Sequence, residues 1–337
     1  MSLSGLIRAL PKAELHLHIE GTLTPERMWS LAQRHGITLP YESVDAITDA
    51  YQFSDLQSFL DLYYQGADVL RDEQDFYLLM QDYLASCNAQ NIVHAEIMFD
   101  PQTHTKRGVG FDVFMPGFLK ALEEAKQMWG ITSTLIMCFL RDLPESDAFD
   151  TLAQAEPWYE HITAVGLDSA EVGNPPEKFT DVFAQARARG FKCVAHAGEE
   201  GPPEYIVQAL DVLHVNRIDH GVKCELAPAL MARLRDKQIA LTVCPQSNLK
   251  LCVIDDMAQH NILRLLDAGL LVTVNADDPS YFDGDLVANF MALERELGMT
   301  AAQLRQLVIN GFTGSFLPEA VKARHIASVN SVFEMAG

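Results

Sequence analysis

The chain has 337 residues, of which 48% are hydrophobic and 21% are charged, a composition typical of a globular protein with a large core. Its 46 acidic and 25 basic residues give a formal net charge of −21, and the absence of a basic patch argues against a nucleic-acid partner. The apolar runs are too short to cross a membrane, the N-terminus lacks a signal-peptide pattern, and the six scattered cysteines form no C-x-x-C pair. We therefore expect a cytoplasmic protein with reduced thiols and no membrane partner.

The first strand-like segment, in the stretch ELHLHIEG at 14–21, places two histidines on one face. Side chains alternate across a strand, so His16 and His18 point one way and the apolar residues between them point the other. Such a pair can hold a metal ion if further ligands converge on it. The alternative is a half-buried strand with two partly exposed histidines.

Short apolar segments and helical patterns then alternate along the chain. The segments read as strands are 14–19, 92–99, 133–140, 164–170, 192–197, 217–220, 240–244 and 271–275. Helical spacing of apolar residues separates them, for example at 179–186, 206–213 and 262–266. Eight such alternations predict an α/β fold, a (β/α)8 TIM barrel that forms a single domain over 1–337.

One connection, residues 22–91, is longer than a single crossover helix requires. It contains three helical patterns, 25–35, 56–70 and 74–90. We expect a helical insertion after strand 1 near the barrel mouth, part of which covers the site. Beyond Pro279, the patterns at 286–297 and 300–309 predict C-terminal helices.

Polar residues follow four of the predicted strands at their carboxyl ends, where the active sites of such barrels lie. His16, His18, His196 and Asp277 form a ligand set for one divalent transition metal per chain. Zinc is the usual occupant, although iron, manganese or cobalt would also be accepted. Such an ion lowers the pKa of bound water towards about 7 and provides hydroxide at neutral pH.

Three further residues at the same strand ends have candidate roles. Glu199 can shuttle a proton, His220 can orient or deprotonate the water, and Asp278 can hold a substrate nitrogen. Each has a structural alternative. Glu199 can simply begin a loop, Asp277 and Asp278 can form a turn closed by Pro279, and His220 can be an internally bonded core histidine.

Four segments, 11–21, 194–199, 217–221 and 274–279, resemble in order and spacing the adenosine/adenine deaminase family of metal-dependent amidohydrolases. The resemblance implies a zinc-bearing barrel that replaces an exocyclic purine amine with oxygen. It implies metal binding by His16, His18, His196 and Asp277, proton donation by Glu199 and water orientation by His220. It also implies that Asp278 contacts purine N7 and that the backbone near Gly173 contacts the far side of the ring.

Two positions and three segments favour the adenine deaminase branch of this family. Glu20 stands where adenosine deaminases usually carry an aspartate that serves the ribose, and Asp219 stands where they usually carry glycine. The segments 99–105, 169–176 and 278–282 also resemble that branch. We interpret Glu20 as a substrate-site residue whose longer side chain crowds the space of a ribose.

The predicted reaction is therefore hydrolytic deamination of adenine to hypoxanthine and ammonia, in purine salvage, by a metal-activated hydroxide that attacks C6. The alternative substrates are adenosine and aminodeoxyfutalosine, since the 14–18 motif also occurs in aminodeoxyfutalosine deaminases. The alternative outside enzymes is a catalytically inactive purine-binding protein. The expected partner is a small purine, and the sequence leads to no prediction of oligomeric state.

Overall fold

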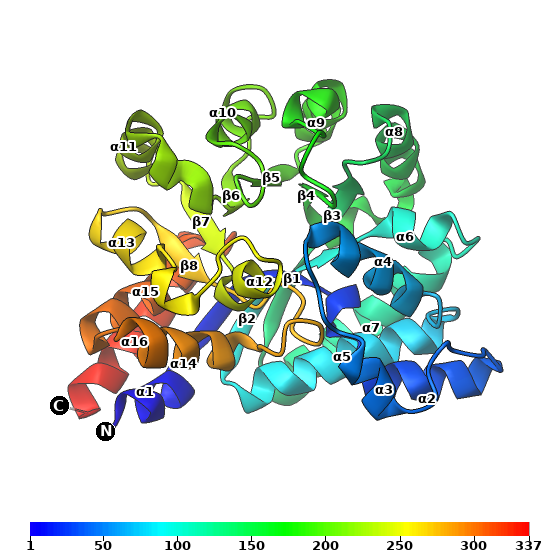
Figure 1. Cartoon of the computed structure of the whole chain (residues 1–337), viewed down its shortest axis with the longest axis horizontal. Helices are drawn as coiled ribbons and strands as arrows, with labels where there is room; N and C mark the ends of the chain where they lie inside the picture. The colour runs from blue at the N-terminus through cyan, green and yellow to red at the C-terminus, as the bar shows by residue number, and fades with distance from the viewer. Residues whose placement is uncertain (337) are drawn as a thin grey trace.

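Eight parallel strands form the centre of the molecule in the computed structural model, which describes residues 1–336 (Figure 1). Each strand pairs with the next one along the chain. The strands are β1 Lys12–His18, β2 Ile92–Phe99, β3 Thr132–Leu140, β4 Ile162–Asp168, β5 Lys192–Ala197, β6 Arg217–His220, β7 Ala240–Val243 and β8 Val272–Val274. The predicted TIM barrel is confirmed.

The barrel closes between β8 and β1 through the residues that follow β8. The Leu15 amide donates to the side-chain oxygen of Asn275 over 2.9 Å. The Asp277 amide donates to the His16 carbonyl over 3.1 Å, and the Asp277 carbonyl accepts from the His18 amide over 3.0 Å. The same contacts that close the barrel therefore place Asp277 beside the two histidines of β1.

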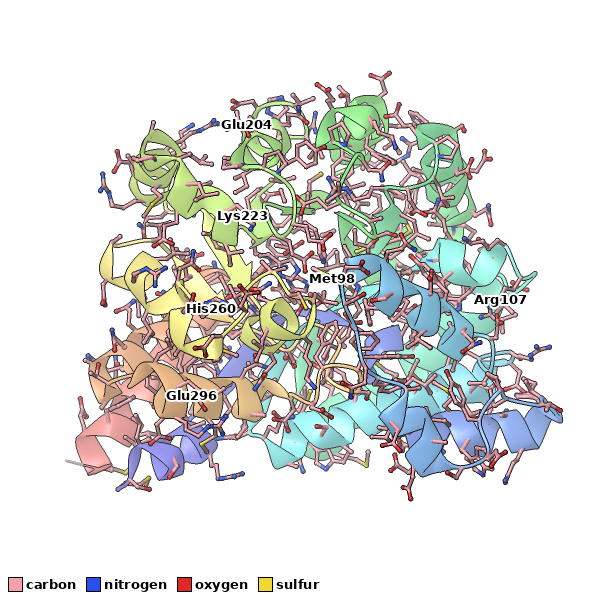
Figure 2. All side chains as sticks on the ribbon, viewed as in Figure 1. Met98, Arg107, Glu204, Lys223, His260 and Glu296 are labelled. Carbon is pink, nitrogen blue, oxygen red and sulfur yellow. The ribbon has the colours of Figure 1, made fainter. Side chains whose placement is uncertain are left out.

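Most strand residues are buried because the strands are covered on both faces. A small cluster fills the barrel interior, and Figure 2 shows one of its members, Met98, near the middle of the ring. Its buried members are Met98, Ile136, Cys138, Ala164 and Val194. The larger core lies between the strands and the surrounding helices. This packing leaves the C-terminal rim as the place where polar side chains collect.

The outer layer consists of the helices that follow the strands, together with helices at both ends of the chain (Figure 1). Those after β2 to β7 are α7 Phe111–Trp129, α8 Glu145–Gln154, α9 Thr180–Ala188, α10 Pro203–Asp211, α11 Pro228–Lys237 and α13 Ile262–Asp267. After β8 come α14 Leu286–Leu297, α15 Ala301–Thr313 and α16 Glu319–Ala336, while α1 Leu3–Ala9 precedes β1. Within residues 1–336, none of the helices has both the length and the apolar character that crossing a membrane requires.

The long connection after β1 divides into two parts with different positions. It contains η1 Glu20–Thr22, α2 Pro25–His35, α3 Val44–Asp49, α4 Leu56–Ala67 and α5 Glu73–Ala89. The last of these, α5, packs against α7 and β2 and so belongs to the outer layer of the barrel. By contrast, α4 lies in front of the strands in Figure 1, and its side chains line the cavity described below. Only α4 therefore acts as the cover that the sequence suggests for part of this connection.

Two short helices begin directly at strand ends and bring further residues to the rim. They are α6 Pro101–Thr105 after β2 and α12 Pro245–Lys250 after β7. Each has proline at its first position, where the missing amide hydrogen is not needed.

Candidate active site

Four side chains converge at the C-terminal rim from β1, β5 and the segment after β8. The Nε2 atoms of His18 and His196 lie 3.2 Å apart. Asp277 Oδ1 lies 3.2 Å from His16 Nε2 and 3.5 Å from His18 Nε2. All four residues are buried, and their candidate ligand atoms lie within 4.8 Å of one another. The predicted metal ligands are thus brought together.

The other ring nitrogen of each histidine faces an oxygen atom. His16 Nδ1 lies 3.2 Å from the Thr242 carbonyl, His18 Nδ1 lies 3.4 Å from Asp168 Oδ2, and His196 Nδ1 lies 3.6 Å from Asp219 Oδ2. With the ring proton on Nδ1, each Nε2 directs a lone pair into the cluster. His16 Nε2 is also a buried atom without a hydrogen-bond partner among the described residues. Three nitrogen lone pairs and a carboxylate that face one another fit a bound divalent cation.

Two residues of the rim adopt a backbone conformation that side chains disfavour. Asp277 has φ +65° and His220 has φ +63°. Such conformations each cost on the order of 1–3 kcal/mol and persist where the surrounding structure enforces them, which is common at functional sites. At both positions the strained backbone directs the side chain towards the cluster.

Glu199 and His220 lie beside the metal-ligand cluster. His220 Nε2 is 3.5 Å from Glu199 Oε1 and 3.6 Å from Asp277 Oδ2. Burial raises the pKa of the Glu199 carboxyl well above its usual range, and the carboxylates of Asp277 and Glu171 raise it further. Burial lowers the pKa of His220 to about 3. Burial therefore favours the protonated form of Glu199 and the neutral form of His220.

A single carboxylate binds the backbone of the loop that carries Glu199. Glu171 is fully buried and accepts hydrogen bonds from four consecutive backbone amides, at distances of 2.7 to 3.1 Å. The donors are Gly198, Glu199, Glu200 and Gly201. Because four amides are held at once, the position of Glu199 is set by Glu171.

A cavity of about 390 Å³ opens from the cluster to solvent. Its floor includes Asp277, Asp278 and Glu199, and α4 supplies apolar and aromatic side chains opposite them. Two contacts tie α4 to the facing rim. Tyr64 Oη lies 2.9 Å from Ser169 Oγ, and the Leu56 amide donates to Glu200 Oε1 over 3.4 Å.

Asp278 lines the cavity next to the cluster, as the sequence predicts for a residue that holds a substrate nitrogen. Its side chain packs against Gly21, where the Cβ of any other residue would collide with the carboxylate. Burial raises the pKa of Asp278 well above its usual range, and Asp277 raises it further. Its Oδ1 is buried without a partner in the part of the chain that the structure describes. Asp278 is therefore available for hydrogen bonding to a ligand.

The structure does not place Glu20 and Gly173 in the cavity wall. The Glu20 carboxylate accepts from the Asp100 amide over 3.1 Å and lies 2.8 Å from His104 Nε2. It therefore reaches the cavity only through Asp100 and Tyr63, whose hydroxyl donates to Asp100 Oδ2 over 3.0 Å. Gly173 is exposed, with φ +81°, because the chain leaves the barrel after β4 ends at Asp168.

Four residues in or under the site have no assigned role in the sequence-based prediction, which uses Asp219 only to separate branches of the family. Asp100 and Asp168 line the cavity, Glu171 holds the Glu199 loop, and Asp219 faces His196. Asp168 ends β4 and Asp100 directly follows β2. The strand-end position that indicates His196 and His220 would also have indicated these two carboxylates. Glu171 carries no such signal, because its partners are backbone amides.

Together, an eight-stranded parallel barrel and a cluster of three histidines and one aspartate at its C-terminal rim define the class of metal-dependent amidohydrolases. The family model described as adenosine deaminase matches residues 11–332. The adenine deaminase of Acinetobacter baylyi is 57% identical over 332 residues, which covers 98% of this chain and 100% of that protein. The adenine deaminase of Sphingopyxis alaskensis is 53% identical, covering 97% and 96% respectively.

Solved structures give the same result. The crystal structure of an adenine deaminase from Arthrobacter aurescens has a TM-score of 0.95 at 46% identity and covers 97% of this chain and 100% of that one. A zinc-bound amidohydrolase from Burkholderia ambifaria has a TM-score of 0.90 at 27% identity, with 99% and 94% covered. The chain belongs to the adenosine deaminase family.

Proposed function

We propose that this protein is a zinc-dependent adenine deaminase, which hydrolyses adenine to hypoxanthine and ammonia. The observation that carries the proposal is a cavity in which a candidate metal-ligand cluster, an acid with a raised pKa and a carboxyl group converge. The relatives named adenine deaminase, 53% and 57% identical over nearly the whole chain, support the choice of substrate.

The metal would be held by His16, His18, His196 and Asp277, whose donor atoms suit zinc. When bound, such an ion supplies Lewis acidity that lets water act as a nucleophile at neutral pH. The zinc bound by the amidohydrolase from Burkholderia ambifaria supports zinc as the occupant. The same donors would also accept iron, manganese or cobalt.

Three side chains around the cluster have separate roles in the reaction. Glu199 carries its proton at neutral pH and donates it to purine N1, which makes C6 more electrophilic. Asp278 hydrogen-bonds N7 and so turns C6 towards the cluster. His220, held beside Asp277 and Glu199, contacts the attacking oxygen.

The proposed deamination takes place in two steps, addition of water and loss of ammonia. Water oxygen bonds to C6, the C6=N1 bond becomes single, and N1 takes the proton from Glu199. The proton released by water then reaches the exocyclic nitrogen through the nearby carboxylates. As the C6–O bond becomes a carbonyl, the second proton of the water leaves that oxygen and returns to Glu199. The C6–N bond breaks, and ammonia leaves with its electron pair, which gives hypoxanthine.

The free base is preferred over a nucleoside because buried acids and tyrosines occupy the side of the cavity next to His18. Asp100 and Asp168 lie there, and Tyr63 covers Asp100. Glu20 acts behind them by fixing the Asp100 backbone. A ribose would have to displace or desolvate these groups, which is unfavourable for a buried carboxylate.

The proposed location is the cytoplasm. All six cysteines are free thiols, and five of them are buried, which suits a reducing compartment.

The test is loss of ultraviolet absorbance when the metal-loaded protein is offered adenine and adenosine in parallel. We expect turnover of adenine and little or none of adenosine. Preference for adenosine would contradict the proposed substrate. Purine binding with no turnover of either compound by protein that contains one metal ion per chain would favour an inactive binder.

A further inference from the structure

The two ring nitrogens of His220 face different groups. Its Nε2 faces Glu199 and Asp277, and its Nδ1 lies 3.4 Å from the side-chain nitrogen of Asn248 on α12. A neutral imidazole has one N–H donor and one acceptor nitrogen. Which nitrogen carries the proton decides whether His220 gives a hydrogen bond to the reacting oxygen or takes a proton from it.

A chain of buried hydrogen bonds begins at a group that can only donate. The backbone N–H of Ile262 points at Nδ1 of His260 over 3.1 Å. Since an amide N–H cannot accept, His260 Nδ1 must be the acceptor, and the proton of the neutral ring lies on Nε2. Burial lowers the pKa of His260 to about 4, which agrees with a neutral ring. Figure 2 labels His260, which lies in the yellow part of the chain between α12 and α13.

The proton on His260 Nε2 fixes the direction of the next two hydrogen bonds. His260 Nε2 lies 3.1 Å from Oδ1 of Asn248, so this N–H donates to the amide oxygen. The NH2 group of Asn248 then faces His220 Nδ1. A rotated amide would instead set the NH2 group against the His260 N–H, which is donor against donor. Asn248 and His220 are fully buried and His260 nearly so, which makes such a mismatch costly.

We propose that Asn248 and His260 are positioning residues that hold His220 as its Nε2–H tautomer, so that His220 donates a hydrogen bond to the attacking oxygen. In this role His220 stabilises negative charge that develops on oxygen. The proton of water then goes to a carboxylate, for which Asp277 Oδ2 is the group nearest to His220 Nε2 after Glu199.

The tautomer follows from the hydrogen bonds alone, whereas its consequence for catalysis rests on the proposed deaminase function. The two parts can therefore fail separately. A protein that does not deaminate adenine would contradict the function and leave the tautomer testable.

The direct test is ring-nitrogen NMR on protein labelled with 15N-histidine, with and without zinc. The chain has 11 histidines, and a His220→Gln variant identifies the His220 signals. We expect a protonated Nε2 and an unprotonated Nδ1 on His220 at neutral pH. A protonated Nδ1 on His220 in the wild-type protein would overturn the proposal.

The second test reverses the hydrogen bond at position 248. In Asn248→Asp a carboxylate replaces the NH2 group, so His220 should shift its proton to Nδ1. We expect kcat on adenine to fall about 100-fold, with KM changed less than about threefold because Asn248 does not line the cavity. Ser247→Ala is the matched control, since Ser247 is a buried neighbour on α12 whose hydroxyl has no partner within residues 1–336.

A pair of variants at position 260 separates the network from packing. His260→Gln keeps an N–H donor for the Asn248 oxygen, and His260→Leu does not. We expect the glutamine variant to retain the Nε2–H signal and most of kcat, and the leucine variant to lose both. Equal kcat and equal ring-nitrogen signals in the two variants would contradict a positioning role for His260.

Discussion

Glu199 is the acid on which the proposed chemistry depends, because its burial keeps a proton available at neutral pH. Glu199→Gln keeps the shape of the side chain and removes that proton. We expect kcat on adenine to fall by roughly 10²–10⁴-fold, with one metal ion per chain retained. Metal analysis and steady-state kinetics on the same preparation test this prediction.

Protonation of Glu199 should make kcat on adenine depend on pH. The raised pKa extends the active acid form of Glu199 to higher pH than for an ordinary glutamate, and kcat should decline as pH rises through that pKa. Glu204→Gln is a suitable control, because Glu204 is exposed on α10 (Figure 2). Glu199→Gln with the same kcat as this control would remove Glu199 from the mechanism.

Asp219 lies behind two of the proposed metal ligands, His16 and His196. Its Oδ2 lies 3.6 Å from His196 Nδ1, and its Oδ1 accepts from Thr242 Oγ1 over 2.8 Å. Thr242 in turn contacts His16 Nδ1 over 3.0 Å. One buried carboxylate thus orients two of the three histidines. Groups of this kind typically contribute about 10–100-fold to metal affinity.

Asp219→Asn should therefore lose metal to a chelator about 10–100-fold faster than the wild-type protein. Zinc release, followed with a coloured chelator, measures this directly and does not depend on turnover. Asp211→Asn provides the comparison, because Asp211 is exposed on α10 and pairs with Arg233. Equal release rates in the two variants would show that Asp219 does not act on the metal.

The loop after β5 depends on a carboxylate from another segment of the barrel. Glu171 follows β4, and its two oxygens hold four amides of that loop. In Glu171→Gln one oxygen becomes an NH2 group that meets amide donors. We expect the free energy of unfolding to fall by about 1–3 kcal/mol, and kcat to fall more than KM rises because Glu199 moves with the loop.

Urea unfolding and adenine kinetics together test this prediction for Glu171. Glu177→Gln, at an exposed position in the turn that follows, should change neither measurement. A Glu171→Gln protein with lower stability but unchanged kcat would mean that Glu171 does not determine the position of Glu199.

At the opposite end of β1, a buried lysine links the stability of the whole molecule to pH. Lys12 donates from Nζ to the carbonyls of Ile7 and Leu10 over 2.8 and 2.7 Å. Burial lowers the pKa of Lys12 from 10.5 to about 7. Between these pH values the unfolded chain binds a proton that the folded chain lacks, so stability rises with pH. The stability gained at high pH is lost again as the pH falls to 7. Below pH 7 Lys12 is protonated in both states, so its effect on stability does not change further.

The slope due to this one group is at most about 1.4 kcal/mol per pH unit. Lys12→Met should remove it, which urea unfolding at several pH values between 7 and 10 would detect. Lys192→Met, at an exposed position at the start of β5, is the control and should keep the wild-type slope. Parallel curves for the wild-type and Lys12→Met proteins would contradict this assignment.

Much of the architecture follows from local sequence pattern. The predicted strands at 92–99, 192–197 and 217–220 coincide with β2, β5 and β6, and the helix predicted at 25–35 coincides with α2. Buried strands appear in the sequence as short apolar runs, and helix ends appear as capping residues. Both signals are local, so they can be recognised from the sequence. By contrast, β4 ends two residues before the predicted 164–170 segment does, because the backbone at Ser169 has φ +72° and leaves the sheet.

The order of the strands in the sequence already places the four proposed ligands, His16, His18, His196 and Asp277, on one rim of such a barrel. The groups that lie behind these four residues are visible only in the folded molecule. Glu20 meets His104, Glu171 meets the Glu199 loop, and Asn248 meets both His220 and His260. These hydrogen bonds depend on which groups remain unpaired when distant segments pack, and strand pattern and residue spacing do not encode that information.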